Sequence, residues 1–158
     1  NTVDAEYYAR LNADKSSPQL NFATQYKAAP GSTFKIVSAT AGLMENVINL
    51  QTKVNCAGTF TEITPSPRCW KISGHGYENV TSAIKDSCNY FFYNVGYQLA
   101  TSSGSYNEEA GLETLSKYAD LYGLTDKSGV EIGEYAPDVS TKDRCVPPSA
   151  RAVTVILR

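Results

Sequence analysis

The chain has 158 residues, with 14 Lys or Arg against 16 Asp or Glu, so its formal net charge is −2 at pH 7. This length is typical of one domain, and a weak negative charge without basic clusters argues against nucleic acid as a partner. The sequence has no apolar run long enough to cross a membrane and no signal peptide. It starts at Asn1 instead of a methionine, so we expect an N-terminal segment to be missing.

The first predicted elements lie before residue 30. The segment 3–11 is typical of a short amphipathic helix with Tyr7, Tyr8 and Leu11 facing inward. A loop follows at 14–18. The segment 20–26 leads toward Ser32 without a clear pattern of its own.

The segment 32–48 predicts a buried helix that begins at a serine. It has no charged residue between Lys35 and Glu45. Two apolar stripes run along it at helical spacing, one of Phe34, Val37, Ala41, Met44 and Ile48, the other of Ile36, Thr40, Leu43 and Val47. Because residues three apart share a helix face, Ser32 and Lys35 can point into one cleft. A lysine in apolar surroundings favours its neutral form, which places a base beside a nucleophile.

The pattern Ser-x-x-Lys is short, and chance alone produces it on the order of once in a chain of this size. Ser82 and Lys85 match it too, but they lack the preceding Pro-Gly and the uncharged helix, so we interpret them as ordinary helix residues. For Ser32 and Lys35, local pattern leaves two interpretations open: a catalytic pair, or a helix cap with a solvated lysine.

A small hairpin is predicted next. The segment 59–63 alternates, 64–67 is a turn with two prolines, and 69–72 returns. His75, the only histidine, lies between two glycines, where a histidine more often makes loop hydrogen bonds than takes part in catalysis.

The sequence contains four cysteines: Cys56, Cys69, Cys88 and Cys145. Cys56 and Cys69 flank the predicted hairpin and could pair outside the cytoplasm, but hairpin register places Cys69 near Glu62, which disfavours a disulfide. A zinc site from Cys56, Cys69 and His75 is disfavoured because the chain has no Cys-x-x-Cys and these three have no fourth ligand. We therefore predict no metal site and no cofactor.

Three further helices are predicted. Asn79 is a good N-cap for a helix over 80–86. A second helix follows the turn 87–89 (Ser-Cys-Asn) and buries Phe92, Val95 and Leu99, with Gly96 allowing close packing. A third, over 108–122, carries Leu112, Leu115, Ala119 and Tyr122 on one face, with Gly123 as its stop signal.

The rest of the chain gives weaker signals. Val130 and Ile132 alternate in a short extended piece. No clear pattern follows residue 137, although 152–157 is compatible with a helix or a strand. A second Ser-x-Asn, at 105–107, lies in a Ser/Gly loop, and we interpret it as a chance match without a function.

The segments 29–35 (Ala-Pro-Gly-Ser-Thr-Phe-Lys) and 87–92 (Ser-Cys-Asn-Tyr-Phe-Phe) together resemble the transpeptidase domain of penicillin-binding proteins. The intervening 74–80 (Gly-His-Gly-Tyr-Glu-Asn-Val) and the later glycine-containing segments at 123–134 resemble it as well. The resemblance covers about 4–137, while 138–158 departs from it. It implies a single partial transpeptidase domain over 1–158.

The resemblance implies a mainly α fragment of the α/β (α+β) fold of penicillin-binding proteins and β-lactamases. We expect a helical subdomain with a small hairpin, most of the antiparallel sheet missing, and apolar residues such as Ile36 or Leu43 left exposed. The family's third motif, Lys-Thr/Ser-Gly on a sheet-edge strand, is expected after Arg158. The letters at 127–129 match it but lie where the family carries a non-catalytic segment, so we expect Lys127 at the surface, away from Ser32.

The same resemblance implies roles for four residues. Ser32 would attack the penultimate D-alanine carbonyl of a peptidoglycan stem peptide, and Lys35 would take its proton, although the acylation base of such enzymes is debated. Ser87 would relay a proton to the leaving group, and Asn89 would bind the substrate amide and help hold Lys35. β-Lactam antibiotics would acylate Ser32. No cofactor is implied.

Two other interpretations stay open. A β-lactamase shares both motifs, but the class A deacylating Glu with its following Leu-Asn is not seen at Glu108, Glu109 or Glu113. A non-catalytic β-lactam sensor on the same fold is the third. The family implies a bacterial protein at the outer face of the cell membrane, held by an anchor in the parent protein, and activity of this chain alone is not expected to match that of a full domain.

Overall fold

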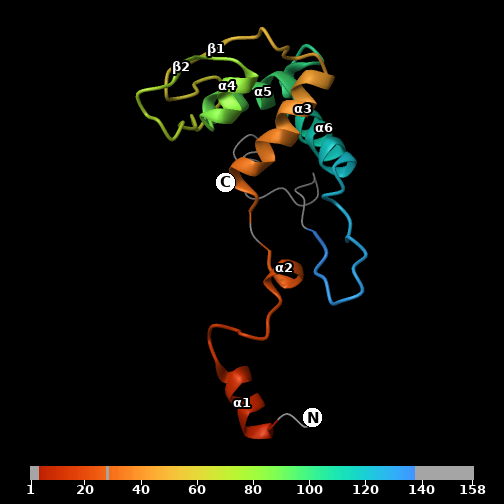
Figure 1. Ribbon diagram of the computed structural model, residues 1–158. Helices are drawn as coiled ribbons and strands as arrows, with labels where there is room; N and C mark the ends of the chain where they lie inside the picture. The colour runs from red at the N-terminus through yellow and green to blue at the C-terminus, as the bar shows by residue number, and fades with distance from the viewer. Residues whose placement is uncertain (1–3, 28, 138–158) are drawn as a thin grey trace.

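The computed structural model describes residues 4–27 and 29–137. Most of the described secondary structure belongs to a helical head made of α3 (Lys35–Met44), α4 (Val80–Lys85), α5 (Asn89–Thr101) and α6 (Glu108–Leu121). A two-stranded antiparallel sheet lies beside these helices (Figure 1). The mainly helical fold with a small hairpin is therefore as predicted.

Helix α3 is central to the head and packs against both α5 and α6. It follows a single 3₁₀ turn, η1 (Gly31–Phe34), and ends at Met44. Val37 and Ala41 are buried in the main apolar core. At Gly42 an added Cβ would lie 2.9 Å from Cγ1 of Val95, so glycine allows α3 and α5 to approach closely.

The predicted faces of α5 and α6 are largely confirmed. The buried residues that the sequence placed on these two helices are Phe92, Val95, Leu99, Leu112, Leu115 and Ala119. Tyr122 is the exception, because α6 ends at Leu121 and leaves this ring 48% exposed. Its hydroxyl pairs with the Thr40 hydroxyl at 2.8 Å. Gly123 follows with a φ of 69°, a left-handed value that suits a helix stop.

The hairpin uses other strands than the sequence predicted. β1 (Val54–Cys56) pairs antiparallel with β2 (Gly76–Glu78), with Cys56 opposite Gly76. The predicted strands 59–63 and 69–72 are wrong, since only one bridge, between Thr59 and Arg68, joins that region. The prolines of the 64–67 turn have no backbone N–H to donate to a ladder.

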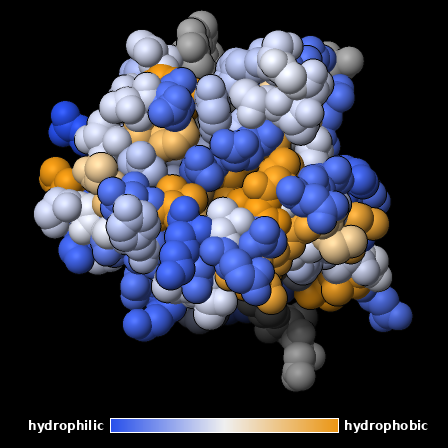
Figure 2. Space-filling model, turned by 90° about the horizontal axis from the view of Figure 1, so that it is seen from above, coloured by the Kyte–Doolittle hydropathy of each residue, from blue (hydrophilic) through white to orange (hydrophobic). Residues whose placement is uncertain are grey.

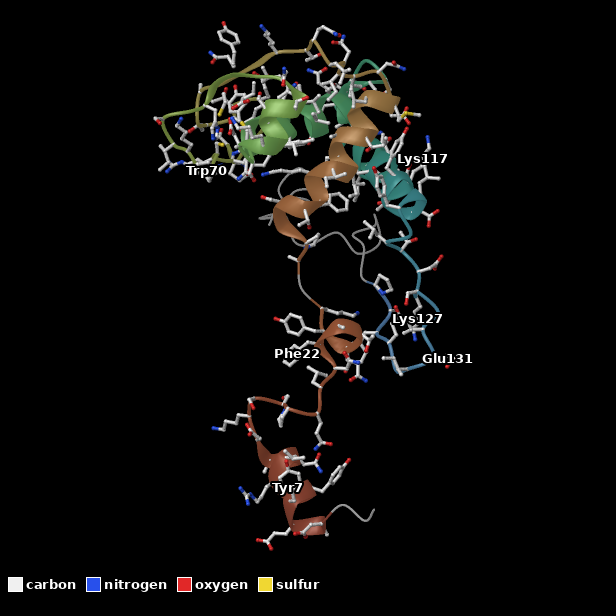
Figure 3. The ribbon with its side chains drawn as sticks, viewed as in Figure 1. Tyr7, Phe22, Trp70, Lys117, Lys127 and Glu131 are labelled. Carbon is white, nitrogen blue, oxygen red and sulfur yellow. The ribbon has the colours of Figure 1, made fainter. Side chains whose placement is uncertain are left out.

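The N-terminal stalk, residues 4–27, extends away from the head and contains α1 (Ala5–Ala13) and α2 (Phe22–Gln25) (Figure 1). The predicted first helix is confirmed, but its inward face is wrong: Tyr7 is 53% and Tyr8 49% exposed, and Figure 3 shows Tyr7 far from the head. The Tyr135 N–H donates to the Thr24 carbonyl at 2.8 Å, so a segment after α6 lies against the stalk.

Parts of the surface carry apolar residues. Ile36 is 54% and Met44 65% exposed on α3, while Leu43 is half-buried, so the prediction of exposed apolar residues on this helix holds for Ile36. Seen from above, apolar residues reach the surface between polar ones (Figure 2). No helix in the described part of the chain is long and apolar enough to span a membrane.

Residues 130 and 132 form no described strand, and both side chains are exposed. The segment 152–157 lies outside the described residues.

Candidate active site

Ser32 and Lys35 sit where the chain changes from η1 to α3. Ser32 lies in the 3₁₀ turn and is exposed, whereas Lys35 is the first residue of α3 and only 2% exposed. The Thr33 N–H and hydroxyl both donate to the Pro30 carbonyl, which stabilises this turn. The Ser32 residue is therefore exposed to solvent, and the lysine three residues later is not.

The turn 87–89 lies between α4 and α5. Ser87 has a φ of 50°, in the left-handed region that L-residues rarely adopt. Cys88 is the N-cap residue of α5, and Asn89 is its first helical residue. Strain of this kind is held by surrounding structure and is found preferentially at functional sites.

Lys35 connects the two motifs. Its Nζ donates to the Ser32 hydroxyl oxygen at 3.1 Å, to Asn89 Oδ1 at 2.6 Å, and to both the carbonyl and hydroxyl oxygens of Ser87 at 2.9 and 2.8 Å. The Ser87 hydroxyl in turn donates to Ser32 Oγ at 2.8 Å. The four residues predicted from the sequence are thus brought together within hydrogen-bond distance.

Burial makes the Lys35 amine easier to deprotonate than a lysine in water. Burial lowers the pKa of Lys35 below its usual 10.5, with smaller opposing effects from Cys69 and Cys88. The Phe92 ring, whose centroid lies 5.8 Å from Nζ, acts in the opposite direction, because an aromatic face attracts an ammonium group. An ammonium group has three N–H donors for the four acceptors present, whereas a neutral amine has a lone pair that can accept a serine proton. The arrangement can therefore activate a hydroxyl as a nucleophile.

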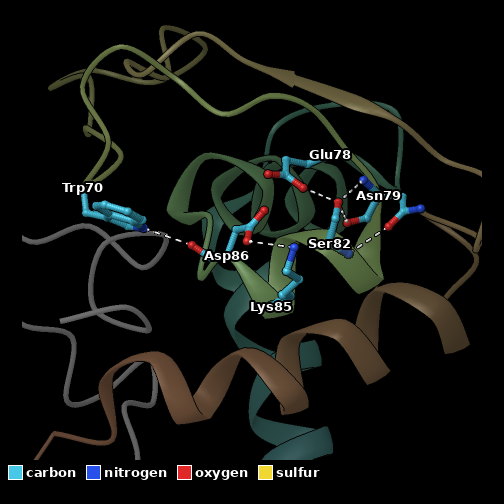
Figure 4. Close-up of polar contacts among 6 residues, drawn as sticks. All are labelled: Trp70, Glu78, Asn79, Ser82, Lys85 and Asp86. Carbon is cyan, nitrogen blue, oxygen red and sulfur yellow. Dashed lines mark hydrogen bonds and ion pairs between the residues drawn. The ribbon is translucent and has the colours of Figure 1, made fainter.

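Trp70 was not singled out by sequence analysis, yet it contacts this site. Its indole Nε1 donates to the carbonyl oxygens of Asp86 and Ser87, both at 3.1 Å, and Figure 4 shows the bond to Asp86. Its ring also packs edge-on against His75, with centroids 5.1 Å apart. The sequence feature that could have drawn attention to Trp70 is that it is the single tryptophan of the chain.

The two look-alike motifs lie elsewhere. Ser82 and Lys85 belong to α4, where Ser82 completes the cap and the Lys85 side chain is 81% exposed (Figure 4). Lys127 is exposed and lies away from the start of α3 (Figure 3). Among the described residues no hydrogen bond joins Lys127 to Ser32 or Asn89.

A second cluster lies behind the 87–89 turn. We call it the thiol–imidazole group; its members are Cys56, Cys69, His75 and Cys88, whose donor atoms all lie within 4.8 Å of one another. The three thiols are free, so no disulfide joins Cys56 to Cys69. The absence of a fourth ligand inferred from the sequence is corrected here, because the fold brings Cys88 beside the other three.

A family model described as the penicillin-binding protein transpeptidase domain matches residues 3–146. The chain belongs to this family. The peptidoglycan D,D-transpeptidase MrdA of Haemophilus influenzae is 31% identical over 144 residues, which are 89% of this chain and 20% of that protein. Stage V sporulation protein D of Bacillus subtilis is 33% identical over 104 residues, covering 65% of this chain and 14% of that protein.

Solved structures of penicillin-binding proteins share the fold of this chain. The crystal structure of PBP2 from Pseudomonas aeruginosa matches with a TM-score of 0.77 at 23% identity, over 89% of this chain and 30% of that one. The chain spans about a fifth of the length of the MrdA relative.

Proposed function

We propose that the protein containing this chain is a serine D,D-transpeptidase that cross-links peptidoglycan stem peptides and is acylated by β-lactams at Ser32. The observation that carries the proposal is the buried Lys35 amine, which lies within hydrogen-bond distance of both Ser32 and Ser87. The related Haemophilus protein is named a peptidoglycan D,D-transpeptidase, which supports the reaction class.

In the acylation step, Ser32 Oγ attacks the carbonyl carbon of the penultimate D-alanine, and its proton passes to the neutral Lys35 amine, directly or through the Ser87 hydroxyl. The tetrahedral intermediate then expels the terminal D-alanine, whose amine receives a proton through Ser87. An ester between Ser32 and the stem peptide remains. Lys35 returns to its neutral form as the leaving group is protonated.

In the second step, an amine of another stem peptide attacks this ester and passes its proton back to Ser32 through the same groups. The Asn89 side chain accepts from Lys35 through Oδ1, and under this proposal its amide N–H binds the substrate backbone. Under this proposal the protein works at the outer face of a bacterial cell membrane, through an anchor in its parent protein. Peptidoglycan peptides and β-lactams are its partners.

Labelling of the full-length protein with a fluorescent penicillin tests the proposal. We expect a covalent adduct on Ser32, located by mass spectrometry of tryptic peptides, and complete loss of labelling in Ser32→Ala. Ser105→Ala, in the exposed second Ser-x-Asn segment, is the matched control and should label like the wild type. An adduct on another residue would refute the assignment, and rapid turnover of the penicillin would favour a β-lactamase.

A further inference from the structure

Trp70 holds the turn that carries Ser87. It lies in the loop between β1 and β2, and its Nε1 donates to the carbonyl oxygens of Asp86 and Ser87, both at 3.1 Å. Trp70 is 62% exposed, so burial of its ring does not explain this placement. We propose that Trp70 is a positioning residue for acylation, whose indole N–H fixes the Ser87 backbone and thereby aims the Ser87 hydroxyl at Ser32. This inference rests on the proposed function of Ser32.

The backbone of the turn supplies only half of the bonds that hold it. Helix α4 ends in the two backbone bonds of a Schellman motif. The Cys88 N–H donates to the Ala83 carbonyl at 2.9 Å, and the Ser87 N–H donates to the Ile84 carbonyl at 3.2 Å. The left-handed position of this motif, usually a glycine, is taken by Ser87 with a φ of 50°. These bonds use the N–H groups of the turn and leave its carbonyl groups to other donors.

The indole N–H supplies a donor on the carbonyl side. The Asp86 carbonyl belongs to the peptide plane before Ser87, and the Ser87 carbonyl belongs to the plane after it. Because φ and ψ of Ser87 are the rotations between these two planes, one donor shared by both oxygens restrains both angles. Lys35 Nζ donates to the same Ser87 oxygen at 2.9 Å, so both lone pairs of that oxygen have partners. The Ser87 backbone is therefore held from two sides, by α3 and by the loop that carries Trp70.

The direction of the Ser87 hydroxyl depends on this backbone. The hydroxyl donates to Ser32 Oγ at 2.8 Å and accepts from Lys35 Nζ at 2.8 Å. Since Cβ moves with the backbone, a rotation of Ser87 out of the left-handed region would carry its hydroxyl away from Ser32. A proton that passes from Ser32 through Ser87 to Lys35 needs both bonds at once. Misplacement of a reacting group by about 1 Å can cost about 10²-fold in rate, so the indole bond matters to the acylation step.

Two other roles for Trp70 predict different losses. An N–H that only caps the end of α4 would contribute to folding stability and leave the acylation step unchanged. A ring that only contacts substrate through its exposed face would change the affinity for penicillin before the covalent bond forms. The contacts favour positioning, because the ring packs edge-on against His75 with centroids 5.1 Å apart while its N–H is directed at the backbone of Ser87.

The test compares two replacements of Trp70 in the full-length protein. Trp70→Phe removes the N–H and keeps an aromatic ring. Benzothienylalanine, introduced at the same position by nonsense suppression, keeps the size of the indole and replaces only its N–H by a sulfur atom. Stopped-flow kinetics with a fluorescent penicillin separate the dissociation constant of the noncovalent complex from the rate constant of acylation.

We expect both replacements to lower the acylation rate constant about 10–100-fold and to leave the dissociation constant unchanged. Tyr77→Phe, which removes the hydroxyl from a 76% exposed ring of β2, is the matched control and should equal the wild type in both constants. A wild-type acylation rate constant in the benzothienylalanine protein would refute the inference. So would a loss confined to the dissociation constant, or a loss of folding stability with acylation intact.

A crystal structure of the Trp70→Phe protein gives a readout that needs no labelling. We expect the peptide after Ser87 to rotate and Ser87 Oγ to leave hydrogen-bond distance of Ser32 Oγ, and an unchanged turn would refute the positioning role. The two proposals fail in different ways. A wild type that takes no label at Ser32 would overturn the proposed function, whereas a labelled wild type with unaffected Trp70 variants would overturn the role of Trp70 alone.

Discussion

The chain contains Ser-x-x-Lys twice, and the two copies have opposite environments. Lys35 is 2% exposed and binds three other residues through its amine. The Lys85 side chain is 81% exposed, and it forms an ion pair 3.7 Å long with the neighbouring Asp86. The two serines differ as well: the Ser32 hydroxyl meets the amine three residues later, whereas the Ser82 hydroxyl turns back to the backbone and to Glu78 (Figure 4).

The comparison shows that the Ser-x-x-Lys pattern by itself does not determine the environment of the lysine amine. In both copies, serine and lysine lie three residues apart, but Lys35 begins α3 whereas Lys85 ends α4. At Lys35 the helix is buried, so the amine loses solvent and its pKa falls. A second turn supplies acceptors for its N–H groups. At Lys85 water solvates the ammonium, and such exposed pairs contribute little to stability.

Replacing each lysine in turn should give the largest contrast. Lys35→Ala removes the amine that can take the Ser32 proton, and general-base catalysis typically contributes on the order of 10²–10⁴-fold. We expect the second-order rate of acylation by penicillin in the full-length protein to fall by this factor. Stopped-flow or gel-based labelling of the purified variants measures it.

Lys85→Ala is the matched control and should leave the acylation rate within about twofold of the wild type, because its side chain is solvated. Equal losses in the two variants would mean that the wrong copy was chosen as the catalytic pair.

A pH–rate profile sharpens the comparison. Only the neutral amine can accept a proton, so the acylation rate should rise with pH as Lys35 loses its proton. Since burial lowers the pKa of Lys35, the midpoint of this rise should fall below the usual 10.5. The profile is obtained from labelling rates of the full-length protein over the pH range where it remains folded.

Lys35→Ala provides the reference for this profile, because any rise that persists without the amine belongs to another group. A wild-type midpoint at or above 10.5 would contradict the effect of burial.

The main elements could be predicted because their signals are local, and the four candidate site residues could be named together because the family resemblance links their two motifs. The uncharged run after Lys35, the Asn79 cap and the stop at Gly123 each depend on neighbouring residues. The meeting of Ser32 with Ser87 did not follow from local physics. It followed from the resemblance, and the distances between their side chains agree with it.

The features that were missed depend on contacts between distant segments. The strand pairing of Cys56 with Gly76 spans a loop, and the turn signal at 64–67 favoured a nearer partner. Cys88 meets Cys69 and His75 only in the folded chain, so its spacing in the sequence gave no signal of this cluster. Tyr7 has the spacing of a buried helix face, but in the described part of the chain nothing covers it.

The smallest effect on acylation should come from Ser82→Ala, which removes the hydroxyl of the second copy. This hydroxyl accepts from the Asn79 N–H at 3.0 Å and donates to the buried Glu78 carboxylate. Loss of a helix cap costs about 1 kcal/mol, and an unpaired buried acceptor costs about 1–3 kcal/mol. We therefore expect the free energy of unfolding to fall by about 1–3 kcal/mol in denaturant titrations, with the acylation rate unchanged at low denaturant.

Lys85→Ala, on the same helix, should change stability by less than about 0.5 kcal/mol. A Ser82 variant that keeps full stability but loses acylation would reverse the roles of the two copies.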